Sequence, residues 1–229
     1  MDPSELSRRI RFLHWFLRLL ARLLTRLEVH GADKIPATGP TLLTMNHLHW
    51  LDPPIGFILV ARPATMFAAD KWEARPVIGD LLRWTQSTIF VARGEVDRKA
   101  LGQALEVLKA GGLLAIAPEG TRSKTGALQQ GQDGPAYLAS RTGAVIVPVG
   151  AFGQEKAVTC WKRLRRPRIV VQIGEPFVLP GTPNKAKGPQ LTVYTDEIMR
   201  QIACLLPPEY RGVYTRAEAP AAAPAPEMN

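Results

Sequence analysis

Hydrophobic and polar positions along this chain follow two different periods. Short apolar runs, bounded by glycine, proline or polar residues, have the length of buried strands. Other segments repeat apolar residues at intervals of three and four, as amphipathic helices do. The predicted strands are 40–46, 64–69, 88–93, 113–118, 144–149 and 168–174, and the predicted helices after the first are 53–61, 75–84, 97–109, 134–141 and 190–205. This alternation predicts an α/β domain with a mostly parallel central sheet flanked by helices.

The first segment, residues 5–28, predicts one continuous helix with two unlike faces. Most of its circumference is leucine, isoleucine and phenylalanine, and a basic stripe is formed by Arg8, Arg11, Arg18, Arg22 and Arg26. Arginines at successive turns argue against a transmembrane span, which needs about 20 largely uncharged residues, and no signal-peptide pattern is present. The wide apolar face predicts an amphipathic helix in a membrane interface. The alternative is a terminal helix packed on the protein's own core, with its arginines in solvent.

The length of 229 residues fits one main domain with short additions at each end. We assign residues 1–30 to the membrane-associating helix, 31–212 to the main domain, and 213–229 to a disordered tail rich in alanine and proline. Cys160 and Cys204 are too few for a disulfide framework and lie in no metal-binding spacing. Two buried thiols and no metal site are therefore expected.

The charge balance favours anionic partners. Lysine and arginine number 29 against 20 aspartates and glutamates, and nucleic acid, acidic lipid, a phosphorylated substrate or an acidic carrier protein fits this excess. The densest basic run, residues 162–168, has no interleaved aromatics beyond Trp161 and belongs to no nucleic-acid module, so nucleic acid is not an expected partner. We interpret the run as the solvated rim of a hairpin or, together with the first helix, as a contact for anionic lipid.

Candidate chemistry begins where the strand 40–46 ends. His47 and Asp52 follow it, and on a continuous helix this spacing would separate them by about 140°. They meet only if the chain turns between them, which the two prolines after Asp52 favour. An imidazole held by a carboxylate is a general base for an attacking hydroxyl. Three alternatives stay open: Asp52 as a helix N-cap, His47 as a partly buried histidine without chemistry, and His49 as the base.

A second polar cluster follows the strand 113–118. Gly120 permits close backbone approach, Thr121 offers a donor and Arg122 can bind phosphate through its guanidinium, so the segment predicts a cradle for an anion. Glu119 cannot bind phosphate and would hold the arginine or contact a substrate hydroxyl. Arg93 ends the strand 88–93, and two arginines at the ends of two strands of one sheet would converge on one phosphate. The alternative is a polar turn after a buried strand.

Taken in order, these segments resemble the four motifs of the glycerophospholipid acyltransferases, and most closely the bacterial 1-acylglycerol-3-phosphate acyltransferases. The matching residues are Asn46-His47 with Asp52, Phe90-Val91 with Arg93, Pro118 to Ser123, and Val147-Pro148-Val149. Further stretches of the family are matched by Lys71 with Pro76 and Gly79, and by Gly174 to Phe177. The likeness covers residues 31–177. Each motif alone is weakly specific, whereas four in order are strong.

The resemblance implies transfer of a fatty acyl group to the free hydroxyl of 1-acylglycerol-3-phosphate, giving phosphatidic acid for phospholipid biosynthesis. The implied donor is acyl-CoA or acyl carrier protein, with no metal or redox cofactor. His47 is implied as the general base and Asp52 as its partner. The residues implied in substrate binding, mostly at the glycerol-phosphate head, are Arg93, Glu119, Gly120, Thr121, Arg122 and Lys71.

The resemblance also implies a peripheral or monotopic protein on an anionic membrane surface, at the cytoplasmic face of the cell membrane. Two alternatives stay open: an acyltransferase for another lysophospholipid or a lyso-aminolipid, and a non-catalytic membrane-binding module. Three positions depart from the family's usual pattern. His49 stands where a small polar residue is usual, Ala117 where phenylalanine precedes the proline, and Gln132 where a lysine is often found. The last departure removes a cation from the predicted phosphate site and leaves the acceptor's identity open.

Overall fold

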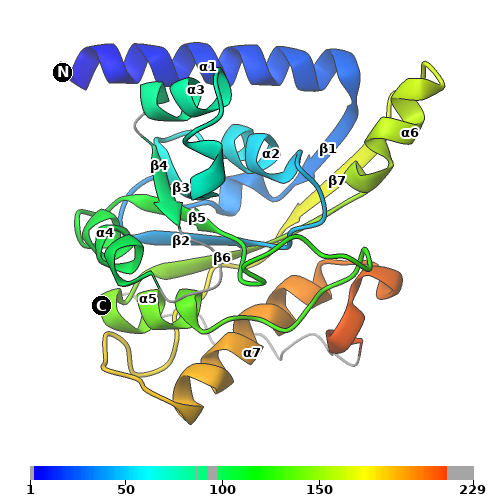
Figure 1. Cartoon of the computed structure of the whole chain (residues 1–229). Coiled ribbons are helices and arrows are strands. Elements are labelled where there is room, and N and C mark those ends of the chain that lie inside the picture. The colour runs from blue at the N-terminus through cyan, green and yellow to red at the C-terminus, as the bar shows by residue number, and fades with distance from the viewer. Residues whose placement is uncertain (1–2, 86, 92–96, 216–229) are drawn as a thin grey trace.

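The computed structural model describes residues 3–85, 87–91 and 97–215, and Figure 1 shows a sheet between two layers of helices. The sheet has seven strands in the order β1-β7-β6-β2-β5-β3-β4, and every neighbouring pair is parallel except β6 and β7. The strands are β1 (Arg26–His30), β2 (Thr41–Met45), β3 (Ala64–Ala69), β4 (Thr88–Val91), β5 (Leu113–Ile116), β6 (Val145–Phe152) and β7 (Arg168–Ile173). The predicted mostly parallel sheet flanked by helices is confirmed.

Helices cover both faces of the sheet (Figure 1). One face carries α1 (Pro3–Leu24), α2 (Asp52–Leu59) and α3 (Ile78–Thr85), and the other carries α4 (Arg98–Lys109), α5 (Gly134–Thr142) and α7 (Pro189–Cys204). α6 (Ala157–Lys162) follows β6 and precedes β7 in the sequence, where we predicted no helix. The described residues also form five 3-10 turns, η1 to η5, at Ala32–Lys34, Asp70–Trp72, Gln154–Lys156, Pro208–Tyr210 and Gly212–Tyr214. The predicted tail lies outside the described residues from position 216 on.

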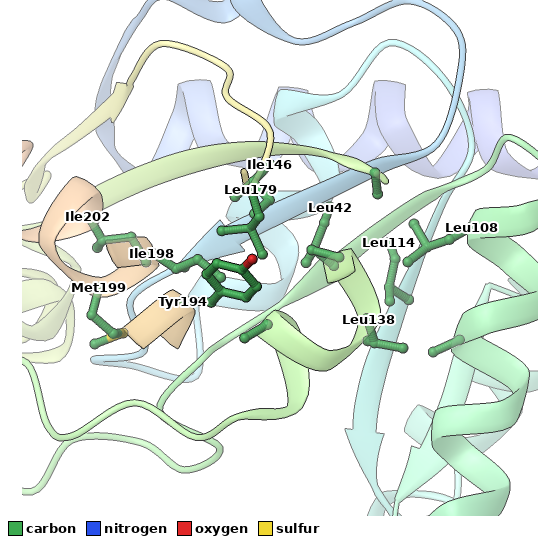
Figure 2. Packing of buried hydrophobic residues seen from close by; sticks show 14 of the residues in the cluster. Leu42, Leu108, Leu114, Leu138, Ile146, Leu179, Tyr194, Ile198, Met199 and Ile202 are labelled. Atoms are coloured by element: carbon green, nitrogen blue, oxygen red, sulfur yellow. The ribbon is translucent and has the colours of Figure 1, made fainter. Parts of the chain in front are cut away.

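Alternation along the strands builds a separate core on each face of the sheet. In β2, Leu42 joins the cluster formed with α4, α5 and α7, whereas Leu43 joins the cluster formed with α2. Figure 2 shows the first cluster, in which Leu108, Leu138 and Ile198 come from three different helices. Full burial of one leucine side chain contributes about 2 kcal/mol. β2 is therefore held from both faces, and its C-terminal end has a fixed position.

The first helix ends earlier than predicted. α1 stops at Leu24, and Arg26–His30 forms β1, which pairs in parallel with β7. Thr25 closes the helix, because its backbone N and its Oγ1 donate to the Ala21 carbonyl at 2.9 and 2.6 Å. The helix prediction is therefore wrong for positions 25–28. Polar and apolar residues alternate in Arg26–His30 as in a strand. Pairing with β7, which is distant in the sequence, makes this segment a strand and not the end of the helix.

α1 packs on the protein with one narrow face and leaves a second apolar face exposed. Ile10 is buried, His14 lies edge-on to Phe57 of α2 with ring centroids 4.4 Å apart, and the Arg9 guanidinium lies over the Trp84 ring. At 100° per residue, the opposite face carries an exposed stripe. Its members are Phe12, Trp15, Phe16, Leu19 and Leu23. The packed face matches the alternative of a docked terminal helix, but a docked helix needs no second apolar stripe. Within the described residues, no helix is both long and apolar enough to cross a bilayer.

Docking of α1 is expected to weaken in mild acid. Burial lowers the pKa of the His14 imidazole below 6.5, the Phe57 backbone raises it and Arg18 lowers it again. Because the folded state binds this proton less readily than the unfolded state, the free energy of unfolding falls as the pH drops below 6.5. His14→Phe keeps the ring contact and should lose part of this dependence in urea unfolding at neutral and acidic pH. Equal pH dependence in both proteins would contradict this account.

Candidate active site

The ring of His47 and the carboxylate of Asp52 meet at the C-terminal end of β2. Nδ1 of His47 lies 2.7 Å from Oδ2 of Asp52. The loop after β2 reverses into α2, whose first residue is Asp52, so the turn that the sequence required between the two residues is present. Asp52 is buried, whereas the His47 side chain is 19% exposed. With Nδ1 bonded to the acid, Nε2 is the ring nitrogen left for a substrate.

The Asp52 carboxylate holds the loop as well as the ring. Its Oδ2 also accepts from the backbone N of Leu48 and of His49, both at 2.7 Å, and its Oδ1 accepts from Nε2 of Gln154 at 3.0 Å. The alternative of a helix N-cap is wrong, because Leu51 occupies the N-cap position of α2 and the Asp52 carboxylate accepts from the loop that precedes the helix. An ionised carboxylate only accepts hydrogen bonds, so the contact assigns the imidazole hydrogen to Nδ1 and leaves Nε2 free to accept a proton.

The loop after β5 is joined to the loop after β2. These strands are parallel neighbours, so their C-terminal ends lie at one edge of the sheet. Oε1 of Glu119 accepts from the His47 backbone N at 2.8 Å, and Oε2 accepts from the Gln129 backbone N at 3.0 Å. The Ser123 backbone N donates to the His47 carbonyl at 2.8 Å. His47 is therefore attached through its own backbone to the motif at residues 118–123.

Glu119 is buried and holds two loops together. Burial raises the pKa of its carboxyl group, while the backbone donors of His47 and Gln129 lower it. Both of its oxygens accept from the protein. These contacts position the loop of His47, and the predicted contact of Glu119 with an arginine or a substrate hydroxyl stays a prediction.

Asn46 fixes β2 to its other neighbour, β6. Its Nδ2 donates to the Ala151 carbonyl at 2.8 Å, and its Oδ1 accepts from the Ala151 backbone N at 2.7 Å. The side chain is almost fully buried, so both bonds form away from water. Asn46 is thus anchored to β6, and His47, the predicted base, is anchored to the loop after β5.

His49, the rival base, has no comparable arrangement. Its backbone N bonds to Asp52, but its ring Nδ1 is buried and has no hydrogen-bond partner in the part of the chain that the structure describes. Burial lowers the pKa of the His49 imidazole, the Asp52 carboxylate raises it, and the Arg122 guanidinium lowers it. No carboxylate of the described residues forms a hydrogen bond that would fix the tautomer of this ring. The geometry therefore favours His47 over His49 as the base.

The predicted anion cradle forms an exposed turn beside this pair. Gly120 has φ 69°, a left-handed conformation that suits glycine, and its N donates to the Ala117 carbonyl at 3.0 Å. Thr121 and Arg122 are exposed. A Cβ placed on Gly120 would lie 3.4 Å from Cγ of Gln132, so the position where the family often has lysine borders the turn.

The structure does not bring Lys71 to this loop, and Arg93 is not among the residues that it describes. Lys71 is exposed in η2, with its Nζ 5.5 Å from the centroid of the Trp72 ring. No contact among the described residues joins it to the loop after β2. Arg93 lies outside the described residues, so its predicted convergence with Arg122 stays a prediction.

Gln154 is the residue of this site that sequence reasoning missed. It is fully buried, and its Nε2 donates to Oδ1 of Asp52 at 3.0 Å and to the Ala151 carbonyl at 3.2 Å. It follows β6, a parallel neighbour of β2, so it lies at the same edge of the sheet. A polar residue just beyond a strand is the signal that could have found it. We predicted the strand to end at 149, whereas β6 continues to Phe152, which placed Gln154 well outside the predicted strand end.

Replacing Gln154 by leucine is expected to lower both stability and turnover. Leucine leaves Oδ1 of Asp52 and the Ala151 carbonyl without this donor, which should lower the free energy of unfolding by about 1–3 kcal/mol. A looser Asp52 should also lower kcat. Urea unfolding and a rate assay measure the two effects, and Gln190→Leu on α7, an exposed glutamine bonded to the Tyr194 hydroxyl, is the control. Unchanged stability and rate in Gln154→Leu would exclude Gln154 from the site.

Comparison with known proteins agrees with the motifs. A family model described as acyltransferase matches residues 26–151. The chain belongs to the acyltransferase family. The resemblance in the sequence is therefore confirmed, and the matched region of this family contains both loops that meet at His47.

Similar relatives carry more specific names. The chain is 29% identical over 129 residues to 1-acyl-sn-glycerol-3-phosphate acyltransferase of Borreliella burgdorferi, covering 56% of this chain and 51% of the relative. It is 27% identical over 160 residues to the chloroplastic 1-acyl-sn-glycerol-3-phosphate acyltransferase LPAT1 of Arabidopsis thaliana, covering 65% of this chain and 43% of the relative. The chain thus spans about half the length of the curated relatives it matches.

A solved structure shares the fold. The 1-acyl-sn-glycerophosphate (LPA) acyltransferase PlsC from Thermotoga maritima matches with a TM-score of 0.69 at 23% identity, covering 90% of this chain and 82% of that chain. The sheet and its helical layers are therefore those of a known acyltransferase fold.

Proposed function

We propose that this protein transfers a fatty acyl group from a thioester to the free hydroxyl of 1-acylglycerol-3-phosphate, giving phosphatidic acid. The observation that carries the proposal is the 2.7 Å contact between Nδ1 of His47 and Oδ2 of Asp52. The acyltransferase family and the names of the relatives support the reaction class and the acceptor. The donor is acyl-CoA or acyl carrier protein as a co-substrate, and the reaction uses no metal or redox cofactor.

In this reaction His47 moves one proton. Its Nε2 takes the proton of the acceptor hydroxyl while the hydroxyl oxygen attacks the thioester carbonyl. The new C–O bond forms, the C–S bond breaks through a tetrahedral intermediate, and the imidazolium returns the proton to the departing thiolate. Asp52 keeps Nδ1 protonated and stabilises the imidazolium. The nucleophile is the substrate's hydroxyl, so no acyl-enzyme forms.

The phosphate of the acceptor binds at the turn after β5. The exposed Arg122 offers a guanidinium that can form two parallel bonds to phosphate. Thr121 adds a hydroxyl, and Gly120, which has no side chain, lets the phosphate approach the turn closely. We assign Arg93 and Lys71 to the same headgroup on the resemblance of the motifs alone. The Ser123 bond to the His47 carbonyl supports a phosphate site at this turn, because it couples the turn to the loop of His47.

The lipid acceptor is reached at an anionic membrane surface. The exposed stripe of α1, with Phe12, Trp15 and Leu23 among its members, is apolar and aromatic, and the arginine stripe borders it. Such a helix lies in the interface plane and gains from acidic headgroups. We place the protein peripherally or monotopically at the cytoplasmic face of the cell membrane.

Thiol release tests the proposal. The purified protein is mixed with 1-acylglycerol-3-phosphate and either acyl-CoA or acyl carrier protein charged with a fatty acid, and free thiol and phosphatidic acid are measured. We expect both products in equal amounts. Absence of thiol release with both donors would refute the reaction. Faster turnover with another lysophospholipid or a lyso-aminolipid would keep the chemistry and change the acceptor.

A further inference from the structure

The turn after α6 holds a leucine in a conformation that leucine rarely adopts. Leu164 has φ 54° and is 98% exposed. Its N donates to the Trp161 carbonyl and the Arg165 N donates to the Cys160 carbonyl, both at 2.9 Å. This pair of bonds ends many helices, with glycine usually at the left-handed position. Leucine is strained there relative to glycine, and so exposed a side chain gains little by packing. Stability of the fold does not explain this residue.

The same turn is strongly basic. We call residues 158–166 the α6 tip; within it Lys162, Arg163 and Arg165 are exposed and no residue is acidic. Val158 adds a second exposed apolar side chain, and Trp161 is half-buried. An apolar apex surrounded by cations matches the outer region of an anionic lipid layer, where acyl chains lie beneath phosphates.

The α6 tip is attached to the C-terminal end of α1. Nε1 of Trp161 donates to the Leu24 carbonyl at 2.8 Å. Nε of Arg166 donates to the Thr25 carbonyl at 2.9 Å, and its Nη2 donates to the Arg22 carbonyl. In Figure 1 the tip projects beyond the sheet at this end of α1. These contacts place the tip beside the end of α1 at which Leu23 and Leu24 are exposed.

The α6 tip also touches the loop of the candidate active site. Trp50, three positions after His47, is 50% exposed, and its ring centroid lies 6.2 Å from that of Trp161. One run of contacts therefore leads from the end of α1 through the tip to the loop that carries the base. A lipid surface bound at the tip would lie beside the loop that carries His47.

We propose that the α6 tip is a second membrane contact, in which Leu164 enters an anionic lipid layer and the basic side chains around it bind headgroup phosphates. The inference rests on the proposed action at a lipid surface and adds a place where that surface meets the active-site loop. Charge alone would suit nucleic acid or an acidic carrier protein equally well. The fully exposed leucine and its continuity with Leu23 and Leu24 of α1, also exposed, favour lipid.

Leu164→Gly separates binding from folding. Glycine suits the left-handed position, so the thermal midpoint should stay the same or rise. Sedimentation with vesicles of phosphatidylcholine and phosphatidylglycerol in equal parts should show a partition coefficient about tenfold lower than that of the parent protein, from the lost leucine side chain. Val193→Ala, which trims an apolar side chain that is 64% exposed on α7, should bind like the parent. Parent-like binding by Leu164→Gly would overturn the proposal.

Charge variants complete the test. Lys162→Gln, Arg163→Gln and Arg165→Gln should each weaken binding to these vesicles about fivefold and leave binding to phosphatidylcholine vesicles unchanged. Loss of binding to charged acyl carrier protein or to duplex DNA, with vesicle binding intact, would assign the tip to that partner instead and overturn the proposal. None of these measurements needs turnover, so an absence of acyl transfer would refute the proposed function without deciding the role of the tip.

Discussion

Replacing His47 by alanine is expected to lower kcat for acyl transfer by about 10²- to 10⁴-fold, the usual contribution of a positioned general base. The acceptor hydroxyl would then lose its proton only to water, while the phosphate site and the membrane contacts stay intact. Asp52 keeps its bonds to Leu48, His49 and Gln154, so the loop should remain folded. Thiol release measures the rate, and circular dichroism and vesicle sedimentation check the fold and the binding.

His49→Ala is the matched control, because it removes a histidine from the same loop. If His47 is the base, this variant should keep a rate within about tenfold of the parent, since its ring has no orienting carboxylate. The reverse outcome, with His49→Ala inactive and His47→Ala active, would transfer the role to His49. Parent-like turnover of both variants would end the case for histidine catalysis and leave the alternative of a membrane-binding module.

Replacing Asp52 by asparagine is expected to lower kcat by about 10³- to 10⁴-fold, by analogy with the serine-protease triad in which such a change selects the wrong tautomer. Oδ2 of Asp52 receives three donors and Oδ1 receives one. The side-chain NH2 group of asparagine would replace one of these oxygens and would face at least one of the donors. The free energy of unfolding should therefore also fall, by about 1–3 kcal/mol. The rate assay and urea unfolding measure the two effects.

Asp80→Asn provides the control for the loss of one negative charge. Asp80 lies on α3, its side chain is 73% exposed, and it pairs with Arg83 at 2.6 Å. Surface pairs of this kind contribute about 0–1 kcal/mol, so this variant should keep the parent's rate and stability. A small loss of rate in Asp52→Asn, similar to that of Asp80→Asn, would show that the carboxylate does not hold the base.

The candidate site depends on one edge of the sheet. β2 carries His47 at its end, and its two neighbours supply the residues that fix the loop: Glu119 after β5 and Gln154 after β6. The cores on both faces hold these strands, so the positions of the polar groups follow from apolar packing. A rigid sheet with reactive loops at its carboxyl edge is the arrangement in which such sites form.

Much of this was predictable from the sequence. The period of apolar residues located every strand of the described sheet except β1, and most helices, because each pattern reports which face of an element is buried. The order and spacing of the motifs identified the family and the pair His47 and Asp52. Glycine and proline marked the turns, since Gly120 and the two prolines after Asp52 have local conformational preferences that need no partner.

Tertiary structure alone decided the rest. Arg26–His30 is a strand because β7 lies beside it, and a local pattern cannot contain that partner. His47 rather than His49 faces the acid because the loop is held by Glu119 and Gln154, at separations of 72 and 102 positions from the residues that they bind. The same contacts show that Glu119 supports the loop of His47, which no local pattern indicated. Local periodicity reports which residues are buried, but hydrogen bonds between distant loops exist only once the sheet has brought those loops together.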